Sequence, residues 1–153
     1  MADVLTSSVR YRERLSPSLW VLFSAAITAP MVALVFVRVD ATFALIVGFA
    51  VAGLLIAAMI AASPVVEIAD GELHVGRAHI PLALLGEPVA LSGDEARQAR
   101  GPGLSRAAWH MLRGGIDGVV RVPVVDERDP VAEWVFSTRT PDRVVAIIRR
   151  AGG

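Results

Sequence analysis

The chain has 153 residues, of which 54% are hydrophobic and 20% are charged, and its mean hydropathy is +0.57. This composition is too apolar for an ordinary soluble domain of the same length. The formal net charge of zero excludes a general field that would attract nucleic acid, and the lack of cysteine excludes disulfides and thiolate metal sites.

Two long uncharged segments follow one another in the first half of the chain. No charged residue lies within residues 15–37 or within residues 41–66. Because about 20 helical residues cross the ~30 Å hydrocarbon core of a bilayer, both segments are long enough to span it. Buried core helices, or a secretory signal in the first segment, are the alternatives that this pattern disfavours. We expect a transmembrane hairpin over residues 16–66, with helices at about 17–37 and 41–64 and a turn at 38–40.

The arginines near these segments predict the orientation of the hairpin. Arg10, Arg12 and Arg14 precede the first span, whereas the turn carries only Arg38. Basic residues remain on the cytoplasmic side of a membrane protein. Residues 1–15 are therefore expected to be a cytoplasmic segment, with both termini cytoplasmic at a bacterial inner (cell) membrane. The residues expected at the membrane interface are Tyr11, Arg12, Arg14, Trp20, Arg38 and Asp40.

Small residues recur at helical spacing within each span, which lets helix backbones approach closely. The two stripes predict either packing within one hairpin, which we favour, or contact with another membrane protein or a second copy. No ionisable residue lies within either span, which disfavours a proton or ion pathway. Pro30 is expected to disturb the first helix. The stripes are Ala25, Ala29 and Ala33 in the first span, and Ala44, Gly48 and Ala52 in the second.

After the second span the sequence changes to short alternating segments with turn signals, and we expect a cytoplasmic domain over residues 65–153. VVEIADGELHVG predicts two strands joined by an Asp-Gly turn, and a second hairpin is expected around Asp126–Pro130. Residues 141–150 predict a helix with Val144, Ile147 and Ile148 on one apolar face. Because no linker precedes it, the first strand is expected to start at the membrane surface.

Several strands closed by one C-terminal amphipathic helix resemble the pleckstrin-homology-like (PH-like) fold, in the small form found in bacterial membrane proteins. The helix would cover a bent sheet that could not bury its own core. The expected fold class is therefore a membrane α-helical hairpin plus a small α+β domain, in which an antiparallel PH-like β-barrel or sheet is capped by the C-terminal helix.

Four segments resemble an actinobacterial family of two-span integral membrane proteins, the domain-of-unknown-function family thirty ninety-three. They are YRERLSP before the spans, then GELHVGRAHIPLALLGE, RGPG and ERDPVAEWVFSTRTP after them. The resemblance covers nearly the whole chain and implies a bacterial membrane protein without a known activity. The chain departs from the family pattern at Arg113-Gly114-Gly115 and at Glu133, where aromatic residues are usual.

No set of residues predicts a catalytic, cofactor or metal site. His74 and His79 lack a third ligand at metal spacing, so surface or packing roles are favoured. Arg113, Arg121 and Arg139 lie on or beside predicted strands, and guanidinium groups suit carboxylates and phosphates, although ordinary surface ion pairing is the favoured alternative. Trp134 is the candidate aromatic anchor of a docking surface.

Two function classes remain open. The first is a non-enzymatic, membrane-anchored interaction module, an accessory subunit of a larger bacterial membrane complex. The second is a lipid- or anion-binding module at the inner leaflet. The expected partners are the lipid bilayer and another membrane protein or a second copy of this chain, and no nucleic acid is expected.

Overall fold

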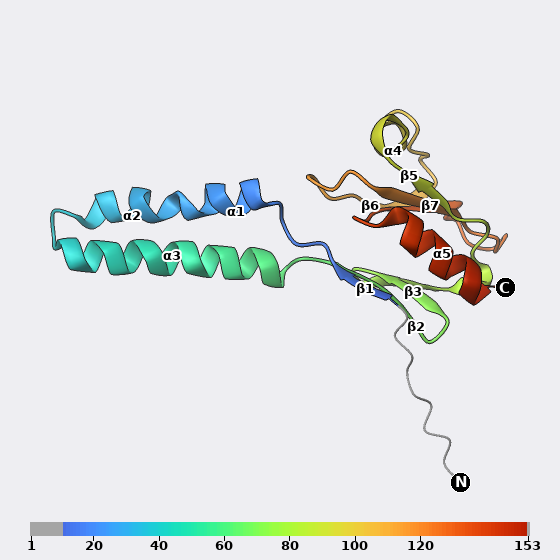
Figure 1. Cartoon of the computed structure of the whole chain (residues 1–153), viewed down its shortest axis with the longest axis horizontal. Coiled ribbons are helices and arrows are strands. Elements are labelled where there is room, and N and C mark those ends of the chain that lie inside the picture. Colours follow the sequence, from blue (N-terminus) through green and yellow to red (C-terminus); the bar gives the residue numbers. More distant parts are fainter. Residues whose placement is uncertain (1–10, 153) are drawn as a thin grey trace, which may run out of the picture. The chain divides into compact units, whose positions relative to one another are not determined.

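The computed structural model describes residues 11–152, and their contacts divide them into two units (Figure 1). The helical unit comprises residues 16–63, and the sheet unit comprises residues 11–15 together with 64–152. The helical unit is therefore inserted into the sequence of the sheet unit. The described residues do not include residues 1–10 of the expected N-terminal segment, among them Arg10. They also do not include Gly153 of the expected tail domain.

The helical unit is the expected hairpin. Its helices are α1 (Leu19–Ala26), α2 (Thr28–Phe36) and α3 (Ala41–Ala61). Side chains cap two of the three N-termini: Ser18 accepts a hydrogen bond from the Val21 N–H at 3.4 Å, and Asp40 accepts one from the Phe43 N–H at 2.7 Å. Asp40, the second charged residue of the turn, is thus the N-cap of α3.

The first span is interrupted at Ile27, between α1 and α2. Pro30 has no N–H, so the carbonyl of Ala26 cannot receive the usual helical hydrogen bond from a residue four positions later. The interruption confirms the expected disturbance at Pro30, and its physical reason is this missing donor.

Small residues form the interface between the two arms of the hairpin. Ala25, Ala29, Ala44 and Ala52 are buried there, and so is Gly48. A Cβ at Gly48 would lie 2.4 Å from the backbone oxygen of Ala29, which shows how closely the two backbones approach. The favoured prediction, that the stripes pack within one hairpin, is confirmed.

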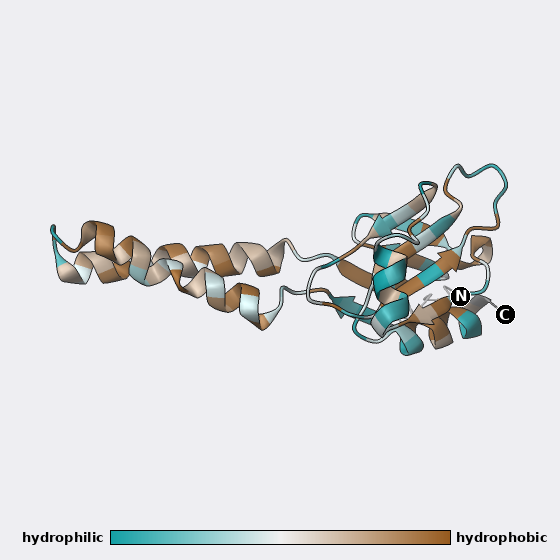
Figure 2. Ribbon diagram, turned by 90° about the horizontal axis from the view of Figure 1, so that it is seen from above, coloured by the Kyte–Doolittle hydropathy of each residue, from teal (hydrophilic) through white to brown (hydrophobic). Residues whose placement is uncertain are grey.

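The outer surface of the hairpin is apolar on both arms (Figure 2). Leu34, Val35, Phe49 and Leu54 are between 70% and 72% exposed. The core helix of a soluble protein would bury such side chains. Large contiguous apolar patches are rarely exposed on soluble monomers. Residues 19–36 and Ala41–Ala61 are long and apolar enough to cross a membrane.

The first sheet of the sheet unit has the strand order β1-β2-β3-β4, and all its pairs are antiparallel. The expected hairpin is confirmed: Asp70 and Gly71 connect β2 and β3, both with positive φ (52° and 79°). The first strand was not predicted, because its residues were assigned to a separate N-terminal segment. The strands are β1 (Tyr11–Arg14), β2 (Val65–Ala69), β3 (Glu72–Val75) and β4 (Ala78–Pro81).

The second sheet has the strand order β5-β7-β8-β6. The expected second hairpin is the antiparallel pair β7–β8, but β6 runs parallel to β8. The prediction of a wholly antiparallel arrangement is wrong at this pair, and no strand pairing among residues 11–152 closes either sheet into a barrel. The strands are β5 (Val89–Leu91), β6 (Ala108–Met111), β7 (Val119–Pro123) and β8 (Glu133–Ser137).

Helices complete the α+β sheet unit. The C-terminal helix α5 (Pro141–Gly152) starts where the sequence predicts, and it buries Val144, Val145 and Ile148 in the main core together with side chains from both sheets. The short helix α4 (Gly93–Arg100) covers a smaller cluster with Ala96 and Ala99. The 3-10 turn η1 (Leu82–Leu84) follows β4.

Candidate functional site

A partly buried carboxylate on β1 organises a connected polar group in the sheet unit. The Glu13 side chain is 13% exposed. Its Oε2 accepts hydrogen bonds from the hydroxyls of Tyr11 at 2.7 Å and Thr138 at 2.5 Å. Its Oε1 accepts the backbone N–H of Arg139 at 3.0 Å and lies 3.6 Å from the guanidinium of the same residue. These contacts use most of the acceptor capacity of a carboxylate.

Tyr11 extends this group toward α5. Its hydroxyl proton points to Glu13, so the Thr140 hydroxyl, 2.8 Å away, donates to the tyrosine oxygen. Burial raises the pKa of Tyr11 above its ordinary value of 10.0, hydrogen bonding with Thr138 and Thr140 lowers it, and the neighbouring Glu13 raises it further. The Arg143 guanidinium lies 5.9 Å from the centre of the ring.

These contacts join two segments that are more than a hundred residues apart in the sequence. YRERL supplies Tyr11 and Glu13, and STRT supplies Thr138, Arg139 and Thr140. Sequence reasoning missed Glu13 and Thr138 as partners. The available signal was the alternation in YRERL, where Tyr11 and Leu15 are buried and the intervening arginines are exposed, as in a half-buried strand. The group fastens β1 to the β8–α5 junction and offers no free nucleophile.

The residues expected at the membrane interface occupy different environments. Tyr11 is a core residue of the sheet unit, 6% exposed, which corrects its assignment to an exposed interfacial position. Arg12 lies 3.8 Å from Glu67 of the neighbouring strand, and Arg14 ends β1 with an exposed side chain. In the helical unit, Trp20 is 79% exposed on α1. Arg38 and Asp40 are exposed in the turn.

The four predicted contact residues are not brought together in one site. Arg121 on β7 lies 3.9 Å from Glu133, and Arg139 belongs to the Glu13 group. The backbone N–H of Arg113 donates to the Ser137 hydroxyl at 2.9 Å. Trp134 is 5% exposed within the main core, because its face of β8 points inward. The prediction of an exposed tryptophan anchor at this position is therefore wrong.

The aromatic residue at the sheet edge is Trp109 instead. Its half-buried ring lies against Trp134, with 4.2 Å between ring centres. It belongs to β6, the edge strand beyond β8, and among the described strands β6 pairs only with β8. The sequence alone does not tell which of the two tryptophans is covered.

The two histidines lie opposite each other on β3 and β4. Their rings stack with 5.5 Å between centres, and His74 lies 3.3 Å from Glu72. No group of three or more potential ligands within residues 11–152 is placed to hold a metal ion. The arrangement is a cross-strand surface pair.

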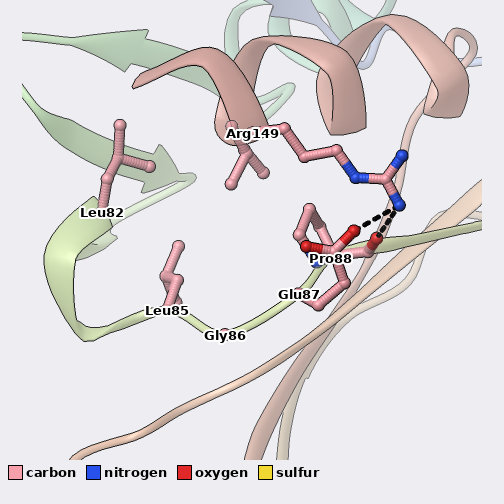
Figure 3. Close-up of a pocket in the computed structure, with 7 residues that line it drawn as sticks. Leu82, Leu85, Gly86, Glu87, Pro88 and Arg149 are labelled. Carbon is pink, nitrogen blue, oxygen red and sulfur yellow. Dashed lines mark hydrogen bonds and ion pairs between the residues drawn. The ribbon is translucent and has the colours of Figure 1, made fainter. Parts of the chain in front are cut away.

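A pocket of about 420 Å³ lies between η1, the segment that follows it and α5 (Figure 3). Leu82, Leu85 and Ile148 provide apolar lining. Arg149 reaches across from α5 to Glu87, 2.5 Å away, and donates to the carbonyl of Pro88 at 3.4 Å. Both charged side chains are more than half exposed, so the ion pair contributes little to stability. Its charges cancel, which leaves no net attraction for an ionic ligand.

The sequence comparisons identify the family of the chain. A family model described as "Protein of unknown function (DUF3093)" matches residues 10–148. The chain belongs to this family. The match includes both segments that meet at Glu13, so membership in DUF3093 confirms the resemblance drawn from the sequence. No curated protein and no solved structure matches the chain. Membership in DUF3093 assigns no activity, ligand or partner, and the actinobacterial origin remains a prediction.

Proposed function

We propose that the protein is a non-enzymatic interaction module, anchored in the bacterial inner membrane by its hairpin and acting as an accessory subunit of a larger membrane complex. The observation that carries the proposal is the edge strand β6, which has one unpaired side among the described strands and bears the half-buried Trp109. Unpaired strand edges accept strands from other proteins, and aromatic side chains anchor interfaces.

Membrane anchorage is supported by the apolar outer surface of the hairpin. The orientation is supported by the sheet: β1 precedes the hairpin, β2 follows it, and the two pair from Tyr11↔Ile68 to Arg14↔Val65. Two strands in one sheet must lie on the same side of a membrane. Together with the arginines before the first span, this supports a cytoplasmic location for both flanking segments.

Strand addition at β6 can be tested by placing a charge on its exposed face. His110 is exposed on β6, and a lysine on an edge strand opposes pairing with another strand. The matched control is Val89→Lys on β5, the opposite edge of the same sheet, where the side chain is 47% exposed. Tagged full-length protein is purified from membranes in mild detergent, and stoichiometric partners are identified by mass spectrometry.

The expected result is a stoichiometric partner that His110→Lys loses and Val89→Lys retains, with equal melting temperatures for both variants. Loss in both variants, or retention in both, would reject β6 as the docking edge. A purified protein that turns over a substrate, with loss of activity on removal of one polar side chain, would reject the non-enzymatic proposal as a whole.

We also propose a distant relationship between the sheet unit and the PH-like fold. The supporting features are two four-stranded sheets and a C-terminal helix whose apolar face enters the core between them. The parallel pair β6–β8 and the open sheets depart from the expected barrel. An experimental structure in which β6 ran antiparallel to a neighbour and the sheets closed would favour the relationship, and the present pairing would count against it.

A second candidate function, binding of anionic lipid at the inner leaflet, is favoured by Arg77 and Arg113, whose side chains have no hydrogen-bond or ion-pair partner within residues 11–152.

A further inference from the structure

The connections to the hairpin leave the sheet unit at one end, which we call the arginine end. It is defined by Arg14, Arg77, Arg113 and Arg139. Arg14 closes β1 opposite Val65, the first residue of β2. Arg77 lies in the turn between β3 and β4, next to Gly76, whose N–H donates to the Val65 carbonyl at 2.8 Å.

The other two arginines reach the same end from the second sheet. A Cβ at Gly76 would contact the sulfur of Met111 at 3.4 Å, so the end of β6 adjoins the β3–β4 turn. Arg113 follows two residues later, and its N–H donates to Ser137 at the end of β8. The Arg139 guanidinium donates to the Arg14 carbonyl at 3.1 Å.

The opposite end of the sheet unit is acidic. The β2–β3 turn meets η1 there, since the Leu82 N–H donates to the Gly71 carbonyl at 2.8 Å. The Val125 N–H, beyond the end of β7, donates to the Leu84 carbonyl at 2.9 Å. The acidic residues on these turns and their neighbours are Asp70, Glu72, Glu87, Asp126, Glu127 and Asp129.

We propose that the arginine end binds the headgroups of anionic phospholipids in the leaflet from which the hairpin enters the membrane. The inference rests on the proposed membrane anchor. Residues 15–18 connect β1 to α1, and residues 62–64 connect α3 to β2. At no more than ~3.6 Å per residue, they keep this end within about 15 Å of an inserted hairpin's entry point.

Two of the arginines are available for this role. The side chains of Arg77 and Arg113 make no hydrogen bond or ion pair within the described part of the chain. Guanidinium groups bind phosphate in a two-pronged geometry, and each basic side chain near an anionic surface contributes about 1 kcal/mol. At the acidic end, Arg149 and Arg128 pair with Glu87 and Asp126, and the remaining carboxylates there are repelled by the same surface.

The test measures the proximity of the arginine end to the bilayer in the full-length protein. The sequence has no cysteine, so Gly114→Cys creates a single labelling site beside Arg113, where an added Cβ meets nothing within 4 Å. An environment-sensitive fluorophore at this site is compared in nanodiscs of phosphatidylglycerol with phosphatidylcholine and in nanodiscs of phosphatidylcholine alone. The test variant is Arg77→Gln/Arg113→Gln.

The control variant, Arg106→Gln/Arg128→Gln, removes the same charge from two exposed arginines outside the arginine end. We expect the fluorophore to report contact with phosphatidylglycerol nanodiscs, and salt to weaken it. The test variant should lower the equilibrium constant for contact roughly 30-fold, while the control retains it. Equal signals in both lipid compositions, or equal loss in both variants, would overturn the inference. Failure of the protein to co-elute with nanodiscs would overturn the membrane anchor as well.

Discussion

At the scale of single residues, Glu13 connects the chain before the hairpin to its C-terminal part. Its carboxylate is the common acceptor for Tyr11, Thr138 and the backbone of Arg139. A partly buried carboxylate costs free energy unless it is hydrogen-bonded, and here Thr138 and Arg139, which follow the hairpin, supply two of its bonds. Glu13 therefore links β1 to the residues that directly follow β8.

Replacing Glu13 with glutamine should lower the free energy of unfolding by about 2 kcal/mol, because one charged acceptor is lost to several donors. Glu67→Gln is the control: that residue pairs with Arg12 at the surface, and its loss should cost less than about 1 kcal/mol. Thermal unfolding of the full-length protein in detergent measures both. Equal melting temperatures for the two variants would contradict a central role for Glu13.

The titration of Tyr11 provides a second prediction at this scale. Its pKa is raised by burial, so the folded state holds the phenol proton more tightly than the unfolded state does. Stability should be unaffected below pH 10.0 and should fall as the pH rises above that value. Tyr11 is the only tyrosine and the chain has no lysine, so tyrosinate absorbance reports this group alone. A midpoint at or below 10.0 in the folded protein would contradict the prediction.

At the scale of elements, the hairpin is held together by close backbone approach. Gly48 lies against the backbone of Ala29 and close to Ala33, so the α2–α3 contact tolerates no side chain there. Gly53 lies on the same helix, and a Cβ at that position would meet nothing within 4 Å. Alanine substitutions at these two glycines therefore separate the effect of helix packing from the effect of helix propensity on stability.

Gly48→Ala should destabilise the helical unit by about 1–3 kcal/mol, because the helices must separate to admit the methyl group. Gly53→Ala should leave it unchanged or stabilise it by up to about 1 kcal/mol, since alanine favours helix. Loss of the far-ultraviolet helix signal during titration with a denaturing detergent measures the difference. If Gly48→Ala were as stable as Gly53→Ala, the packing of α2 on α3 would be disproved.

Elements with local signals could be predicted from the sequence, and those that depend on distant partners could not. The Asp70-Gly71 turn and the Thr140-Pro141 helix start are encoded by neighbouring residues. The strand β1 was missed because its partner β2 lies beyond the whole hairpin. Trp134 and Phe136 lie on the buried face of β8, but the alternation of residues along a strand does not say which face is buried.

At the scale of the whole molecule, the first sheet contains one strand that precedes the hairpin in the sequence, β1, and three that follow it. Arg12 and Glu67 are Cα partners on β1 and β2. Cysteines at both positions should form a disulfide in membranes, because cross-strand partners lie within bonding distance. Arg12→Cys with Glu72→Cys is the control, since Glu72 lies on β3, one strand further away. Peptide mass spectrometry identifies the link, and equal yields in the two pairs would disprove the register.

The insertion of the hairpin between two paired strands also sets an order of events during synthesis. The ribosome makes β1 first and β2 only after both spans, a delay of roughly 3 to 10 s at 5–20 residues per second. Throughout that interval β1 has no sheet to join. If the hairpin is a membrane anchor, as proposed, insertion of only one span would leave β1 and β2 on opposite sides of the bilayer, and Glu13 could not reach Thr138 or Arg139. In the proposed membrane protein, β1 can therefore pair with β2 only when both spans have entered the bilayer.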